Sequence, residues 1–184
     1  GSGIYLRFPT SIPADNVSIF NNIIINNTVG LEVAVADPAT TNGALTNWSV
    51  FNNTFYNNSR SGMYLNKEAS DITGFDLKNN IFSNNGTITP NWNVGQSILN
   101  GDSHTAMNIE NNMKYGEHSS TADRDGINVI FGEAPADTFE DAAGGDFRIK
   151  QGSDAVDNGV LFGAPADDIV GRSRPQFSGV DIGA

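Results

Sequence analysis

Short apolar runs that end in paired asparagines recur along the chain. In each run, apolar positions alternate with other residues before the two asparagines. The four clearest examples are residues 17–22, 48–53, 75–80 and 107–112. An alternation with a period of two is typical of a strand with one buried face, and asparagine is typical of turns. Each run therefore predicts a short strand that is closed by a turn.

The runs repeat at a nearly constant interval. The first asparagines of the four pairs are separated by 31, 27 and 32 residues, which is typical of a solenoid. A second apolar piece with its own asparagine pair follows in residues 23–27, 54–58 and 81–85. A third piece, Gly-apolar-x-apolar, occupies residues 3–6, 30–33 and 62–65. Three short strands in each repeat predict an all-β fold, a short three-sided parallel β-helix.

The asparagine pairs have an architectural interpretation. In the alternation, the first asparagine of a pair shares a face with the buried apolar residues. We therefore expect it to point inward and to form an amide ladder with its equivalents in neighbouring coils, since a buried amide needs hydrogen-bond partners. The second asparagine is then expected in the turn, because asparagine tolerates a positive φ. A calcium site is the weaker alternative, because calcium favours carboxylates.

The third strand of each repeat predicts two columns of outward side chains. The first column holds Tyr5, Glu32 and Tyr64. The second column holds Arg7, Ala34 and Asn66, with Lys67 beside it. Tyrosines two coils apart are separated by roughly 10 Å, and with charged neighbours they predict a saccharide platform. Exposed tyrosines that merely suit a strand are the alternative.

Two tryptophans have different predicted roles. Residues 86–104 interrupt the repeat as a loop insertion, and loops on a rigid scaffold often carry function. Trp92 lies in this insertion, and we expect it either to add an aromatic ring to the sugar site or to cover the core. Trp48 occupies an inward position of the repeat, which predicts a core residue.

Composition narrows the classes of function. The chain has 24 asparagines and 20 glycines among 184 residues, so helix should be scarce. Its net charge is −11, and its 10 basic residues are dispersed, which argues against nucleic acid and anionic membranes as partners. There is no cysteine, which excludes disulfides and thiol nucleophiles. No stretch approaches the roughly 20 apolar residues of a membrane-spanning helix.

These motifs resemble the right-handed parallel β-helix proteins of the pectate-lyase-like superfamily over about residues 3–115. Residues 145–150, 152–159, 168–175 and 180–184 are similar to the segment that closes many secreted bacterial β-helix proteins. The resemblance implies right-handed coils over residues 1–132 and a closing or capping segment of the same domain over 133–184. The charged tail residues then fix turns and ion pairs of the last coil, rather than a catalytic or metal cluster. They are Asp154, Asp157, Asp168, Arg172, Arg174 and Asp181.

The resemblance implies action on polysaccharides. With roughly five coils, the chain is most similar to a β-helical carbohydrate-binding module, of the kind in family 89 that is associated with xylan-degrading enzymes. This implies a monomeric, secreted, bacterial module without catalytic residues that binds a xylan-type plant cell-wall polysaccharide and targets a covalently linked glycoside hydrolase. No cofactor is required, and calcium is left open. One alternative is a lyase or hydrolase fragment in which Arg7 and Lys67 neutralise an acidic sugar. Another is the structural end of a larger surface solenoid.

Overall fold

The computed structural model describes residues 1–8, 13–35, 44–65, 69–86, 98–99, 106–116 and 128–184. Within these residues the chain is all-β, and most of its strands pair in parallel. Helical structure in the described residues is limited to α1 (Pro135–Thr138) and the 3-10 turn η1 (Ala69–Asp71). No helix in this part of the chain is long and apolar enough to cross a membrane. The predicted all-β class and the scarcity of helix are confirmed.

The described strands form three separate parallel sheets and one hairpin. The first sheet has the order β1 (Ser2–Phe8), β5 (Val29–Val35), β8 (Ser61–Leu65), β11 (Ile98–Leu99). The second has the order β4 (Ile23–Ile25), β7 (Thr54–Tyr56), β10 (Ile81–Ser83), β13 (Met113–Tyr115), β14 (Ile130–Phe131). In the third, β2 (Ala14–Asp15) and β3 (Ser18–Phe20) pair with β6 (Leu45–Phe51), followed by β9 (Ile72–Lys78) and β12 (Met107–Glu110). The hairpin pairs β15 (Phe139–Asp141) with β16 (Asp146–Ile149).

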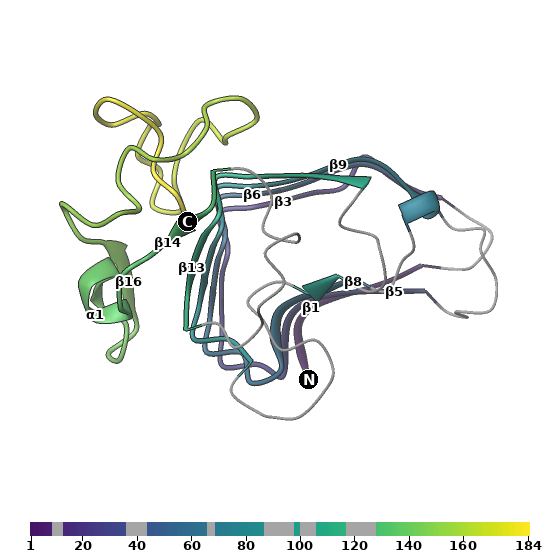
Figure 1. The fold of residues 1–184 in the computed structure, drawn as a ribbon, viewed down its shortest axis with the longest axis horizontal. Helices are drawn as coiled ribbons and strands as arrows, with labels where there is room; N and C mark the ends of the chain where they lie inside the picture. The colour runs from purple at the N-terminus through teal and green to yellow at the C-terminus, as the bar shows by residue number, and fades with distance from the viewer. Residues whose placement is uncertain (9–12, 36–43, 66–68, 87–97, 100–105, 117–127) are drawn as a thin grey trace.

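Neighbouring strands in each parallel sheet come from successive passages of the chain. In the first sheet, for example, Ile4 pairs with Leu31, which pairs with Met63. Figure 1 shows the sheets end-on, so that strands of successive passages overlie one another. Ile98 and Leu99, which lie inside the predicted loop insertion, pair with Tyr64 and Leu65. The segment expected to be only a loop therefore adds a strand to the first sheet.

The inward faces of the three sheets share one apolar core. Its large and fully buried members include Trp48, Phe55, Phe75, Phe82, Leu31 and Met63. Residues that are equivalent in neighbouring passages stack on one another, with ring centroids 5.6 Å apart for Trp48 and Phe75 and 4.8 Å apart for Phe55 and Phe82. The indole nitrogen of Trp48 donates to the carbonyl of Ala14 at 2.8 Å, so its polar atom is satisfied. The prediction that Trp48 is a core residue is confirmed.

Asparagine ladders connect the passages, but the predicted roles within each pair are reversed. In the pairs that follow the third-sheet strands, the second asparagine is the ladder residue. Both the backbone N–H and the side-chain amide of Asn53 donate to Oδ1 of Asn80 at 3.0 Å, and Asn80 donates to Asn112 in the same way at 2.9 Å. Asn22 makes the corresponding bonds to Asn53. A parallel ladder joins Asn27, Asn58 and Asn85.

The first asparagine of each pair turns the chain. Asn21, Asn52, Asn79 and Asn111 have φ between 49° and 56°, the left-handed region that asparagine tolerates better than most residues. A left-handed residue ends the extended backbone, so the alternation of side chains no longer holds beyond the strand. The side chain of the second asparagine then points to the interior. The prediction extended the strand alternation into the turn, and it therefore assigned the ladder to the first asparagine instead.

The segment after the last parallel strand, residues 133–184, lies outside the second sheet (Figure 1). We call it the C-terminal segment. Phe139, Phe147 and Ile182 pack with Ile81 and Met113 in a second apolar cluster. Turn asparagines of four successive passages also hold it: Asn21 donates to Asp167, Asn52 to Asp181, Asn79 to Val160 and Asn111 to Asn158, all to backbone carbonyls. The contacts therefore run along the side of the parallel sheets, whereas the capping hypothesis placed them at the last coil.

The ladder has a measurable contribution to stability. Asn80 is buried and uses its amide group toward Asn53, Val50, Lys78 and Asn112. We expect Asn80→Ala to lower the free energy of unfolding by about 2–4 kcal/mol, because it leaves several buried groups without partners. Asn22→Ala, at the half-buried end of the same ladder, is expected to cost about 1 kcal/mol or less. Urea unfolding followed by circular dichroism measures both values, and equal losses would contradict the ladder's role.

Candidate functional site

The outward face of the first sheet carries the predicted aromatic column. Tyr5 pairs with Glu32, and Glu32 pairs with Tyr64, so the three residues lie side by side on consecutive strands. The residues on either side of them in each strand face the core, where Leu31, Val33, Met63 and Leu65 are fully buried. The alignment of this column, which was expected from the alternation of the strands, is confirmed.

The three side chains of the column have different surroundings. Tyr5 is 52% exposed, whereas Glu32 and Tyr64 are half-buried. The hydroxyl of Ser2 donates to the Glu32 carboxylate. The guanidinium of Arg60 lies over the Tyr64 ring, 5.4 Å from its centroid. The column therefore presents an exposed aromatic ring, a carboxylate held by a hydrogen bond, and a second aromatic ring that stacks against a cation.

The second predicted column is described only in part. Arg7 pairs with Ala34 as expected, and its side chain is exposed. Asn66 and Lys67, the other predicted members, lie outside the described residues, as does Trp92. Their predicted roles in sugar binding stay predictions.

Arg60 is the site residue that the sequence reasoning missed. It precedes β8 and lies four positions before Tyr64. An even offset along a strand places two side chains on the same face, so Arg60 shares the outward face of Tyr64 when the strand is continued toward the N-terminus. The alternation that identified Tyr64 therefore also contained the signal for Arg60. Ser2 has no comparable signal, because the interaction depends on how β1 and β5 approach each other.

The outward face of the third sheet carries a charged cluster that is covered by protein. Lys78 is buried, with its Nζ 3.2 Å from Asp76 and 3.5 Å from Glu110. The ring of Phe162, from the C-terminal segment, lies 5.5 Å from the same Nζ. The C-terminal segment thus contacts this face at Lys78, whose cation is already paired with protein carboxylates.

The tail residues that could be mistaken for a catalytic cluster hold turns, as expected. Asp168 accepts from the backbone N–H groups of Val170 and Arg172, and Asp181 accepts from that of Asp157. Arg174 donates to Asn21 Oδ1 at 2.7 Å and to the carbonyls of Asp167 and Gly183. Burial lowers the pKa of Arg174. The expected ion pairs are wrong for both tail arginines, since in the described residues neither lies within ion-pair distance of an aspartate.

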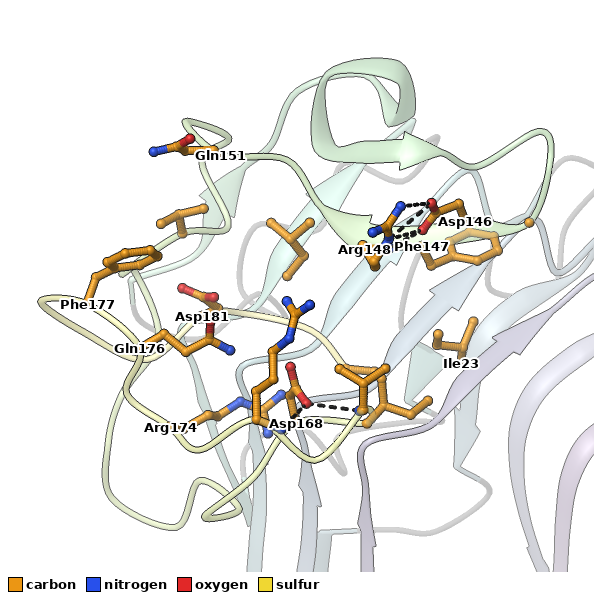
Figure 2. A pocket seen from close by; sticks show the side chains of 17 residues that line it. Ile23, Asp146, Phe147, Arg148, Gln151, Asp168, Arg174, Gln176, Phe177 and Asp181 are labelled. Atoms are coloured by element: carbon orange, nitrogen blue, oxygen red, sulfur yellow. Dashed lines mark hydrogen bonds and ion pairs between the residues drawn. The ribbon is translucent and has the colours of Figure 1, made fainter.

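A groove of about 490 Å³ opens within the C-terminal segment, between β16 and the loop of residues 168–177 (Figure 2). On one wall, the guanidinium of Arg148 holds both oxygens of the exposed Asp146 carboxylate, at 2.5 to 3.1 Å. These hydrogen bonds lower the pKa of Asp146 from 3.8 to about 2. No sequence pattern indicated this groove, because it forms between segments that are far from the strand repeat.

Comparisons of the chain with protein-family models, with curated proteins and with solved structures give no match. Within the described residues, no group of three or more histidine, aspartate or glutamate side chains is placed to hold a metal ion. The family resemblance and the question of calcium therefore stay at the level of prediction.

The Asp146–Arg148 pair has a defined pH dependence. Because the pKa of Asp146 is lowered from 3.8 to about 2, the pair contributes stability above pH 3.8 that is lost as the pH falls toward 2, and solvent screening keeps this contribution small for a pair at the surface. We expect the carboxyl carbon of Asp146, followed by NMR, to titrate near pH 2. Arg148→Ala should raise the midpoint toward 3.8 but not fully to it, because the backbone N–H of residue 148 still donates to Asp146, whereas Lys150→Gln should leave the midpoint unchanged. A midpoint near 3.8 in the unaltered protein would contradict the pairing.

Proposed function

We propose that the three parallel sheets are the sides of a right-handed, three-sided parallel β-helix. The support is the order of the strands, since neighbouring strands of each sheet come from successive passages of the chain. A right-handed path is the general rule for connections between parallel strands of one sheet, and the resemblance to pectate-lyase-like proteins favours it too. The two asparagine ladders mark the turns that separate the second sheet from its neighbours.

We infer that this β-helix is a carbohydrate-binding module and that its binding face is the outward face of the first sheet. The observation that carries the inference is the alignment of Tyr5, Glu32 and Tyr64 on neighbouring strands. The second sheet's outward face packs under the C-terminal segment, and Phe162 covers part of the third. In the described residues, no hydrogen bond or ion pair joins the C-terminal segment to β1, β5 or β8. The first sheet is therefore the side to which the C-terminal segment does not bond in the described residues.

The chemistry of the column suits an extended sugar chain. Tyr5 and Tyr64 are two strand spacings apart, roughly 10 Å, which allows two rings to contact sugar units that are not adjacent. A sugar ring presents an apolar face to an aromatic ring and hydroxyls at its edge. Glu32 lies between the rings as an acceptor for a hydroxyl, and Arg7 lies in the next outward column as a donor. Two rings on a rigid sheet lose little conformational freedom on binding.

A neutral polysaccharide fits the charge of the module better than a polyanion. The net charge of −11 repels a chain with a carboxylate on every sugar. This favours a xylan-type plant cell-wall polymer as the ligand. The proposal includes secretion from a bacterium and a covalent link to a glycoside hydrolase, and both rest on the resemblance alone.

A polysaccharide lyase is the second candidate. Arg7, exposed on the outward face, is the observation that favours it, since a lyase needs cations to neutralise a uronate. In the described part of the face Arg7 pairs with Ala34, and the carboxylate of the next column, Glu32, already accepts a hydrogen bond from Ser2, which disfavours it as a general base. The binding module therefore remains the preferred function.

Affinity electrophoresis through gels that contain xylan, mixed-linkage glucan, pectin or alginate tests this function. We expect retardation in xylan without degradation of the polymer. The Tyr5→Ala/Tyr64→Ala double variant should bind roughly tenfold to a hundredfold more weakly, since each ring contributes about 0.5–1.5 kcal/mol. Tyr5→Phe/Tyr64→Phe is the matched control, because it keeps both rings.

Three outcomes contradict the proposal in different ways. Clearing of pectin or alginate would identify a lyase. Unchanged affinity in the double alanine variant would place the sugar on another face. Equal mobility in all gels would favour a purely structural solenoid.

A further inference from the structure

The groove in the C-terminal segment is a second place where a ligand fits. Figure 2 shows Gln151, Gln176 and Phe177 along one side and Arg148 with Asp146 on the other. Its volume of about 490 Å³ lies within the range of pockets that hold small ligands. It gathers three of the chain's 10 basic residues, namely Arg148, Arg172 and Arg174. Three aspartates, Asp146, Asp168 and Asp181, line the groove as well, so its formal charges balance in a chain with a net charge of −11.

The carboxylates of the groove already accept hydrogen bonds from the protein. Asp146 is held by Arg148 through both oxygens. Asp168 accepts two backbone N–H groups, and Asp181 accepts one. A carboxylate that is satisfied in this way has less remaining capacity to bind a ligand donor. The Oδ1 atoms of Asp168 and Asp181 therefore hold turns in the wall of the groove.

The arginines divide into two kinds. Arg148 is paired with Asp146, and Arg174 is half-buried and donates to three neutral oxygens. Arg172 differs, because its side chain is exposed and has no hydrogen-bond or ion-pair partner among the described residues. Its backbone N–H is held by Asp168, so the base of the side chain is fixed while the guanidinium stays available. Arg172 therefore offers the groove a cationic donor that no described protein group uses, and such a donor favours an anionic acceptor.

The rest of the lining indicates a ring-shaped ligand. Phe177 is 68% exposed although it lines the groove, and Ile169 and Val170 are exposed beside it. An exposed aromatic ring is suited to stack against an apolar ring face. The amides of Gln151 and Gln176 each offer both a donor and an acceptor, which matches the hydroxyls at the edge of a sugar.

We propose that this groove binds a single carboxylate-bearing sugar, a uronate, with Arg172 on its carboxylate and Phe177 against its ring. The site is separate from the tyrosine column on the first sheet and would serve a different ligand group. The net charge of the chain does not prevent this, because charges beyond the Debye length of about 8 Å are largely screened at physiological ionic strength. A single carboxylate facing a nearby guanidinium is therefore governed by local contacts.

Titration of the ¹⁵N-labelled protein with glucuronate, glucose and acetate tests the proposal. We expect glucuronate to bind about tenfold more tightly than glucose, because a charge-assisted hydrogen bond is added. The shifts should be largest for the Arg172 side chain and for the Gln151 and Gln176 amides. Acetate should bind more weakly than glucuronate, because it lacks a ring to contact Phe177.

Two variants locate the interaction. Arg172→Gln should abolish the preference for glucuronate over glucose, and it keeps the backbone hydrogen bond that holds the turn. Lys150→Gln is the matched control, since it removes one positive charge from the same segment but does not line the groove. Phe177→Ala should weaken both sugars to a similar extent. An unchanged amide spectrum verifies the fold of each variant.

The outcomes separate this site from the proposed polysaccharide face. Equal affinity for glucuronate and glucose in the unaltered protein, or a preference that survives Arg172→Gln, would overturn the groove proposal. Equal binding of acetate and glucuronate would identify a simple anion site and would also overturn it. Glucuronate binding that persists in the Tyr5→Ala/Tyr64→Ala variant would support the groove, whatever the polysaccharide gels show.

Discussion

The amide ladder at the turns is the interaction on which the rest of the structure depends. One Oδ1 atom accepts both the backbone N–H and the side-chain amide of the equivalent asparagine in the preceding passage, as between Asn53 and Asn80. This bond satisfies the buried amide and also fixes the vertical register of the strands. In the three passages that have both ladder residues, these are five residues apart, as in Asn53 and Asn58, although the passages differ in length. The variation in length is therefore confined to the other parts of each passage.

The same asparagine pair also positions the C-terminal segment. Because the first asparagine is left-handed, its side chain is not used in the ladder and turns to the outside. Asn21, Asn52, Asn79 and Asn111 thus form a column of amides at one edge of the stack, and this column donates to backbone carbonyls of the segment. The second asparagine of each pair thus forms the ladder in the interior, and the first binds the C-terminal segment on the outside. A single dipeptide serves both purposes because the positive φ of its first residue makes its two side chains point in different directions.

The strand periodicity predicted the parts of the structure that repeat. It located the three strands of a passage, the core position of Trp48 and the alignment of Tyr5 with Glu32 and Tyr64, because each follows from alternation within a strand. It failed for the asparagine pairs, where a left-handed residue interrupts the alternation. It also could not place the groove beside Arg172, since non-repeating segments meet there through turns whose geometry depends on contacts distant in sequence.

The lateral position of the C-terminal segment changes how the stack is expected to hold together. In an ordinary solenoid each repeat contacts only its neighbours, so the stack can open one coil at a time. Here one segment is bonded to Asn21 and also to Asn111, which belong to passages that are not neighbours. Opening one passage would break its bonds to the segment as well as to the adjacent passages. The segment therefore links the passages directly, and this helps to keep Tyr5 and Tyr64, on strands two spacings apart, at a constant separation.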